Sequence, residues 1–137
     1  MDPKTLADTY ISMWNEPDAD RRRAAIHALW HPDAEHVLDP PDELRTTAAR
    51  VGFPHPTLTV RGHAELEFRV TRAYDEFVGP GTMRFAIIGE PRRVGDALML
   101  SWQGIPADGS APGAGGTDIL LLAADGRILR DYQFIAR

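Results

Sequence analysis

The sequence contains no cysteine among its 137 residues. That absence excludes disulfides, thiolate catalysis, iron–sulfur clusters and cysteine-bound zinc. Positive charge is also scarce: 15 Lys and Arg face 20 Asp and Glu, and a net charge of −5 argues against a nucleic-acid or membrane-surface partner. The longest apolar run, Ile119 to Ala124, is too short to span a bilayer. Any chemistry must therefore rest on carboxylates, tyrosines and burial.

What the sequence does contain is the composition of a soluble globular protein. Hydrophobic residues make up 43% and charged residues 26%, which is too apolar for general disorder. The length predicts a single domain over residues 1–137. No apolar segment follows Met1-Asp2-Pro3-Lys4, so we expect no secretion signal and a cytoplasmic protein.

The predicted elements change from helix to strand along the chain. Apolar periodicity predicts helices over Leu6–Trp14, Asp20–Trp30 and a stretch led by Gly62, and composition predicts a weakly apolar helix over Asp42–Val51. Extended segments are expected at Glu35–Asp39, Thr57–Val60, Met83–Ile88, Ala97–Gln103, Thr117–Ala124 and Arg127–Ile135. This order predicts an α+β fold, with helices packed on one face of a curved sheet and a pocket between them.

Several candidate motifs lack the context that their chemistry requires. Gly113–Gly116 precedes a strand, whereas a phosphate-binding loop precedes a helix. His27 and His31 are four residues apart on one helix, but Pro32 ends that helix and no His-Glu-x-x-His motif is present. No serine lies in a Gly-x-Ser-x-Gly elbow. We therefore expect no metal, no cofactor and no nucleophilic hydrolase.

Three polar side chains occupy positions where the pattern expects apolar ones. Tyr10 lies on the buried stripe of the first helix, Asp39 ends the first extended segment, and Asp118 begins an apolar strand. An aspartate that faces a core has its pKa raised by desolvation. Each residue also has a structural interpretation: Tyr10 as core, Asp39 as a helix cap, and Asp118 as the open end of its strand.

The order of these segments resembles a known family. The two N-terminal helices, the segment Trp30-His-Pro-Asp-Ala-Glu-His-Val-Leu-Asp-Pro40, the Gly62-led helix and the strands around Asp125-Gly126-Arg127-Ile128 are similar to the nuclear-transport-factor-2-like superfamily. Its SnoaL-like group, related to polyketide cyclases and ketosteroid isomerases, is the most similar. The resemblance implies a cone of three main helices on a strongly curved antiparallel or mixed sheet, an apolar pocket, and a homodimer.

The resemblance to ketosteroid isomerases implies roles for the same three residues. Asp39 matches the general base, while Tyr10 and a protonated Asp118 match the two oxyanion donors. The isomerases carry a tyrosine on the third helix where this sequence has Val70, so the substrate must differ. The expected pocket residues are Trp14, Trp30, Val70, Tyr74, Trp102, Leu120, Gln133 and Ile135.

The function expected from this resemblance is binding of a small hydrophobic, carbonyl-containing molecule, with proton-transfer isomerisation or aldol-type cyclisation. Two alternatives remain: a non-catalytic binding module, and an epoxide-hydrolase-like enzyme suggested by Arg130-Asp131-Tyr132. Spacing from Gly126 predicts Gln133 and not Asp131 in the pocket, with Asp131 on a solvated face. Strand alternation relative to Asp39 predicts that His36 lies at the surface or at a dimer edge.

Overall fold

The first helix begins where its sequence provides a cap. The Asp2 carboxylate accepts a hydrogen bond of 2.8 Å from the Thr5 backbone N–H, and Pro3 occupies the first turn. The computed structural model describes residues 1–136. Its helical elements are α1 (Pro3–Asn15), α2 (Ala19–Leu29), α3 (Asp42–Arg50), α4 (Gly62–Ala73) and a π-helical turn, η1 (Tyr74–Val78). Its strands are β1 (Trp30–Leu38), β2 (Leu58–Arg61), β3 (Met83–Val94), β4 (Ala97–Pro106), β5 (Gly115–Leu122) and β6 (Ile128–Ile135).

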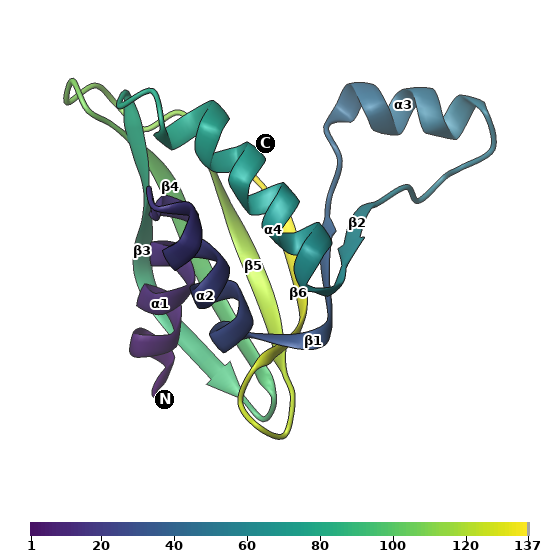
Figure 1. The fold of residues 1–137 in the computed structure, drawn as a ribbon. Coiled ribbons are helices and arrows are strands. Elements are labelled where there is room, and N and C mark those ends of the chain that lie inside the picture. The colour runs from purple at the N-terminus through teal and green to yellow at the C-terminus, as the bar shows by residue number, and fades with distance from the viewer. Residues whose placement is uncertain (137) are drawn as a thin grey trace.

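The six strands form one mixed sheet in the order β2-β1-β6-β5-β4-β3. β1 and β6 run parallel, and every other neighbouring pair is antiparallel. Helices α1, α2 and α4 cover one face of this sheet (Figure 1). The prediction of an α+β fold with helices on a curved mixed sheet is confirmed.

The core lies between these three helices and the sheet. Helix α1 contributes Leu6, Tyr10 and Met13, each 3% exposed or less, and β4 contributes Leu98 and Leu100. These positions follow the helical spacing and the strand alternation expected of elements with one buried face. The buried face of α1 therefore holds Tyr10 against the sheet.

The register of the last two strands brings four side chains to one face. Asp118 on β5 is opposite Gln133 on β6, and Leu120 is opposite Asp131. Because strand side chains alternate with a period of two, all four point to the helix-covered side. Asp118, Leu120 and Asp131 are 0% exposed. Asp131 therefore lies in the core, and the predicted solvated position is wrong.

Helix α3 differs from the other helices in its surroundings. It has no buried residue, and with its flanking loops it stands away from the helix-covered face (Figure 1). The Asp42–Val51 segment was expected to be helical, and that is confirmed. Among residues 1–136, no helix is long and apolar enough to cross a membrane.

Candidate functional site

A cavity of about 330 Å³ opens between α1, α4 and the sheet. Its walls are mostly apolar, and the polar groups in them are the side chains of Tyr10, His36, Arg69 and Gln133 together with two indole rings. A mostly apolar wall with a few polar groups is typical of small-molecule sites. The full lining is Tyr10, Ile11, Trp14, His36, Leu38, Arg69, Ala73, Phe77, Met83, Phe85, Trp102, Ala114, Gln133 and Ile135.

Tyr10 connects this cavity to two buried carboxyl groups. Its hydroxyl oxygen lies 2.7 Å from Asp118 Oδ2 and 2.6 Å from Asp131 Oδ2. A tyrosine hydroxyl carries one proton, so it can donate to only one of the two carboxyl groups. The other carboxyl group must itself be protonated and donate to the Tyr10 oxygen. The geometry therefore requires one proton shared within the pair.

Asp118 has the surroundings of an ionised carboxylate. Besides the Tyr10 hydroxyl, it accepts a hydrogen bond of 2.8 Å from Trp102 Nε1 and bonds of 3.2 and 3.3 Å from Gln133 Nε2. Gly116 gives the indole room, because a Cβ there would lie 2.9 Å from Trp102 Cζ2 and 2.6 Å from the Phe134 carbonyl oxygen. Three side-chain donors thus hold the negative charge on Asp118.

Asp131 is the carboxyl group that keeps the proton. Burial raises its pKa well above the ordinary value, and both the charge of Asp118 and a hydrogen bond with that carboxylate raise it further, against a smaller opposing effect of Tyr10. Its Oδ1 has no hydrogen-bond partner among residues 1–136, so the proton belongs on Oδ2, where Tyr10 accepts it. The pKa of Tyr10 is also raised well above 10.0, first by burial and then by the two carboxyl groups. Tyr10 therefore stays protonated and donates to Asp118.

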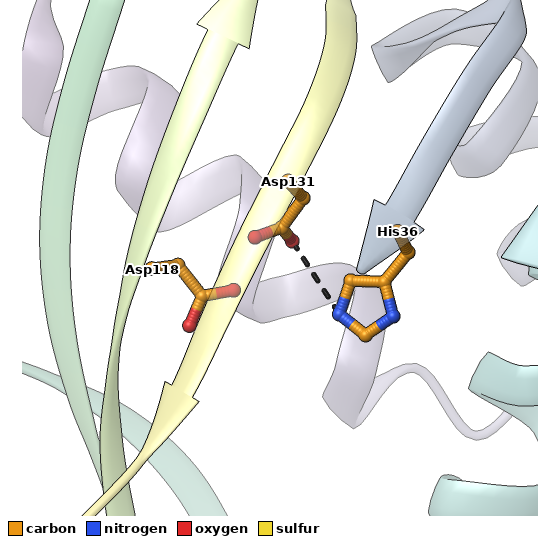
Figure 2. Close-up of side chains that lie close together, drawn as sticks. All are labelled: His36, Asp118 and Asp131. Carbon is orange, nitrogen blue, oxygen red and sulfur yellow. Dashed lines mark ion pairs between the residues drawn. The ribbon is translucent and has the colours of Figure 1, made fainter. Parts of the chain in front are cut away.

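His36 completes the cluster from the parallel strand β1. Figure 2 shows its ring turned toward Asp131, with Nε2 3.7 Å from Oδ2. Arg69 Nη1 lies 2.9 Å from His36 Nδ1, and a guanidinium only donates. Nδ1 must therefore accept, which puts the ring proton of a neutral His36 on Nε2. Burial and the Arg69 charge lower the pKa of His36 to about 3, against a smaller opposing effect of Gln133.

The same three residues offer a donor set of the kind that binds metals. One ligand atom each from His36, Asp118 and Asp131 lies within 4.8 Å of the others. A metal would need both carboxylates ionised and a free imidazole lone pair at Nε2. The Tyr10 bridge requires a proton on the carboxyl pair, and Arg69 directs the imidazole proton to Nε2. The arrangement of these side chains therefore fits a shared proton better than a metal ion.

The structure separates Asp39 from the other two predicted catalytic residues. Tyr10 and Asp118 are in direct contact, whereas Asp39 follows the end of β1 and does not line the cavity. The Asp39 carboxylate lies 3.1 Å from Arg45 Nη2, and its backbone N–H donates to the Gln133 carbonyl. On β1 the residues that reach the cavity are His36 and Leu38, with the opposite parity to Asp39.

The residues predicted to line the pocket divide into two groups. Trp14, Trp102, Gln133 and Ile135 line the cavity. The others do not reach it. Trp30, Val70 and Leu120 are fully buried in the core, and Tyr74 lies under the Arg22 guanidinium, 4.5 Å from the ring centroid.

Two residues of the buried polar cluster, His36 and Asp131, were missed from the sequence, and so was Arg69 at the cavity wall. His36 is 1% exposed, so the prediction of a surface or dimer-edge position is wrong. The faces of β1 were assigned by taking Asp39 as the inward residue, which turned His36 outward. Asp131 was missed although it shares strand parity with Gln133, which was expected in the pocket. The alternation of β6 alone would have found it.

Comparisons with known proteins place this geometry in a structural context. No family model matches the chain, and no curated protein matches it. A proposed isomerase of the SnoaL-like family from Agrobacterium tumefaciens shares 27% identity at a TM-score of 0.78, covering 98% of this chain and 97% of that one. An NTF2-like protein of unknown function from Exiguobacterium shares 20% identity at a TM-score of 0.62, and the match covers 96% of this chain and 98% of that one. TerC, co-crystallised with polyporic acid, shares 19% identity at a TM-score of 0.58, and the match covers 96% of this chain and 91% of that one.

Proposed function

The chain belongs to the nuclear-transport-factor-2-like superfamily, alongside SnoaL-like proteins, and from this premise we propose that its cavity binds a small hydrophobic, carbonyl-containing molecule and catalyses proton transfer on it. The observation that carries the proposal is Tyr10, whose side chain lines the cavity and whose hydroxyl bridges two buried carboxyl groups. The neighbour TerC, crystallised with polyporic acid, supports ligand binding by this fold.

Tyr10 is the group that would touch the ligand, and Asp118 is the base behind it. A proton leaves the carbon next to the ligand carbonyl for the Tyr10 oxygen as the Tyr10 proton moves to Asp118, and an enolate remains. The reverse movement returns the proton to another carbon, which completes an isomerisation. In an aldol-type cyclisation, the enolate carbon attacks a second carbonyl group and Tyr10 protonates the resulting alkoxide. Asp131 donates to the Tyr10 oxygen throughout.

The environment of the cluster suits such a transfer. Asp118 and Asp131 are both 0% exposed, and a hydrogen bond to a developing charge is stronger in a dry site than in water. The Tyr10 hydroxyl and the Asp118 carboxylate are already held by their hydrogen-bond partners, so little reorganisation accompanies the proton movement. This assignment replaces Asp39 as the base, because the Asp39 carboxylate pairs with Arg45 and does not line the cavity.

A binding module without catalysis is the second candidate. The observation that favours it is that neither Asp118 nor Asp131 itself lines the cavity, since Tyr10, His36 and Gln133 stand in front of them. An epoxide-hydrolase-like role has less support. It needs an arginine between carboxylates, whereas Arg69 contacts His36 and Arg130 is exposed.

Hydrogen exchange into a probe ketone distinguishes these candidates. We expect the wild-type protein to accelerate deuterium uptake at the α-carbons of 2-tetralone in D₂O, followed by NMR. Tyr10→Phe should reduce that acceleration by about 10²-fold, the contribution of a positioned acid–base group. Tyr74→Phe is the matched control, because Tyr74 lies outside the cavity, and it should retain the rate. Binding without exchange would leave the binding module, and no binding would contradict both.

A further inference from the structure

Arg69 is the one charged side chain among the cavity-lining residues, and no Asp or Glu lines the cavity with it within residues 1–136. We infer that the cavity selects ligands that carry an anionic oxygen group, a carboxylate or phenolate, and that Arg69 is the counter-ion for that group. This inference rests on the proposed binding of a small hydrophobic molecule and names its chemical class.

The guanidinium of Arg69 is held in place with part of its donor fork unused. Nη1 donates to the Leu58 carbonyl at 3.0 Å, to the His36 carbonyl at 3.3 Å and to His36 Nδ1 at 2.9 Å. All of its hydrogen bonds within residues 1–136 run through this one nitrogen. Nε and Nη2 remain available, and an arginine fork can bind a carboxylate with two parallel hydrogen bonds.

The partners of Arg69 are neutral, so its charge has no direct counter-ion in the described chain. His36 accepts from it as an uncharged imidazole, and the other two partners are backbone carbonyls. Burial lowers the pKa of Arg69, and the charge of Glu65, one turn earlier on α4, opposes that shift. Glu65 is exposed, however, and its carboxylate accepts from the Arg61 backbone N–H at 2.9 Å. The Asp118 carboxylate is fully buried and already accepts from Tyr10, Trp102 and Gln133.

The other walls define the rest of the ligand. Trp14, Phe77, Met83 and Phe85 give the cavity apolar surfaces that fit an aromatic or alicyclic body. An isolated cation at such a wall is costly to desolvate unless an anion joins it. A ligand with one acid group and a compact apolar body satisfies both features. Charge-assisted hydrogen bonds of this kind correspond to about ten- to a hundredfold in affinity.

A matched pair of probes tests this selectivity. 2-Naphthoate and 2-naphthamide differ in charge and little in shape, and their binding to the folded full-length chain can be followed by quenching of the tryptophans at the cavity wall. We expect the wild type to prefer 2-naphthoate by about tenfold or more. Arg69→Met should remove the preference, while Arg69→Lys should retain part of it. Arg72→Met is the control, because Arg72 is exposed on the same helix and does not line the cavity.

The outcomes separate this inference from the proposed function. Equal affinity of the wild type for both probes would overturn the inference and leave small-molecule binding intact. Binding of neither probe would contradict the proposed function and the inference with it. If Arg69→Met does not fold, the Arg69→Lys variant takes its place. A ratio of 2-naphthoate to 2-naphthamide affinity that is reduced in Arg69→Lys and unchanged in a folded Arg72→Met control supports the counter-ion role.

Discussion

Replacing His36 by glutamine tests whether the core holds this imidazole neutral. The side chain is 1% exposed, and burial with the Arg69 charge lowers its pKa to about 3 from 6.5. Glutamine is uncharged at every pH and keeps an acceptor for Arg69. The difference in unfolding free energy between wild type and His36→Gln therefore isolates the protonation of His36.

The sign and size of the effect follow from linkage. The unfolded chain protonates His36 below pH 6.5, whereas the folded protein does not do so until about pH 3. The contribution of His36 to stability is thus complete above pH 6.5 and is lost as the pH falls toward 3. Each pH unit in this window costs about 1.4 kcal/mol, so the wild type should lose about 3 kcal/mol relative to the variant between pH 7.5 and 4.5.

Urea unfolding of both proteins at several pH values measures this difference directly. Other titrating groups act on both chains and largely cancel in the subtraction, although Asp131 lies close enough to couple with His36. We expect the stability gap to shift steadily toward the variant as the pH falls. If the unfolding free energies of the two proteins run parallel from pH 7.5 to 4.5, the claim that His36 is buried as a neutral imidazole is refuted.

Three further changes have expected outcomes. Asp131→Asn should shift the difference in unfolding free energy in the opposite direction. The raised pKa of Asp131 stabilises the folded protein at low pH, and this contribution is lost as the pH rises. The wild type should therefore gain stability relative to this variant on acidification, measured by the same urea series. Tyr10→Phe should lower the unfolding free energy by about 1–3 kcal/mol, because two buried carboxyl groups lose their bridge, while Tyr74→Phe loses no such bond; thermal unfolding compares them. Asp39→Asn should leave the affinity for 2-naphthoate unchanged in a fluorescence titration, since Asp39 pairs with Arg45 outside the cavity lining; a marked loss would return Asp39 to the site.

The fold was predictable because its signals are local. The Asp2-Pro3 cap, the stripe through Tyr10 and the turn at Asp125-Gly126 all lie within one element or one hairpin. The extent of β3 was not predicted, since the strand continues from Ile88 to Val94 through a register shift beside Gly89, whose φ is +67°. A bulge keeps a strand paired beyond a glycine that reads as its end.

The site was predicted only in part because it depends on pairings between distant strands. Tyr10 and Asp118 were found from polar side chains at buried positions, and their contact joins residues that are 108 apart. His36 and Asp131 meet through the parallel pairing of β1 with β6, which no local pattern specifies. Once the face of β1 was assigned from Asp39, the same alternation turned His36 away from the cluster.

The chemistry proposed for this cavity depends on one proton that remains within the buried carboxyl pair, on Asp131, at neutral pH. Carbon-13 NMR of the aspartate carboxyl groups at pH 7 tests it most directly. We expect one protonated carboxyl group in the wild type, absent from Asp131→Asn and retained in Asp39→Asn. A wild-type spectrum in which every carboxyl group is ionised, or a protonated signal that survives Asp131→Asn, would contradict it.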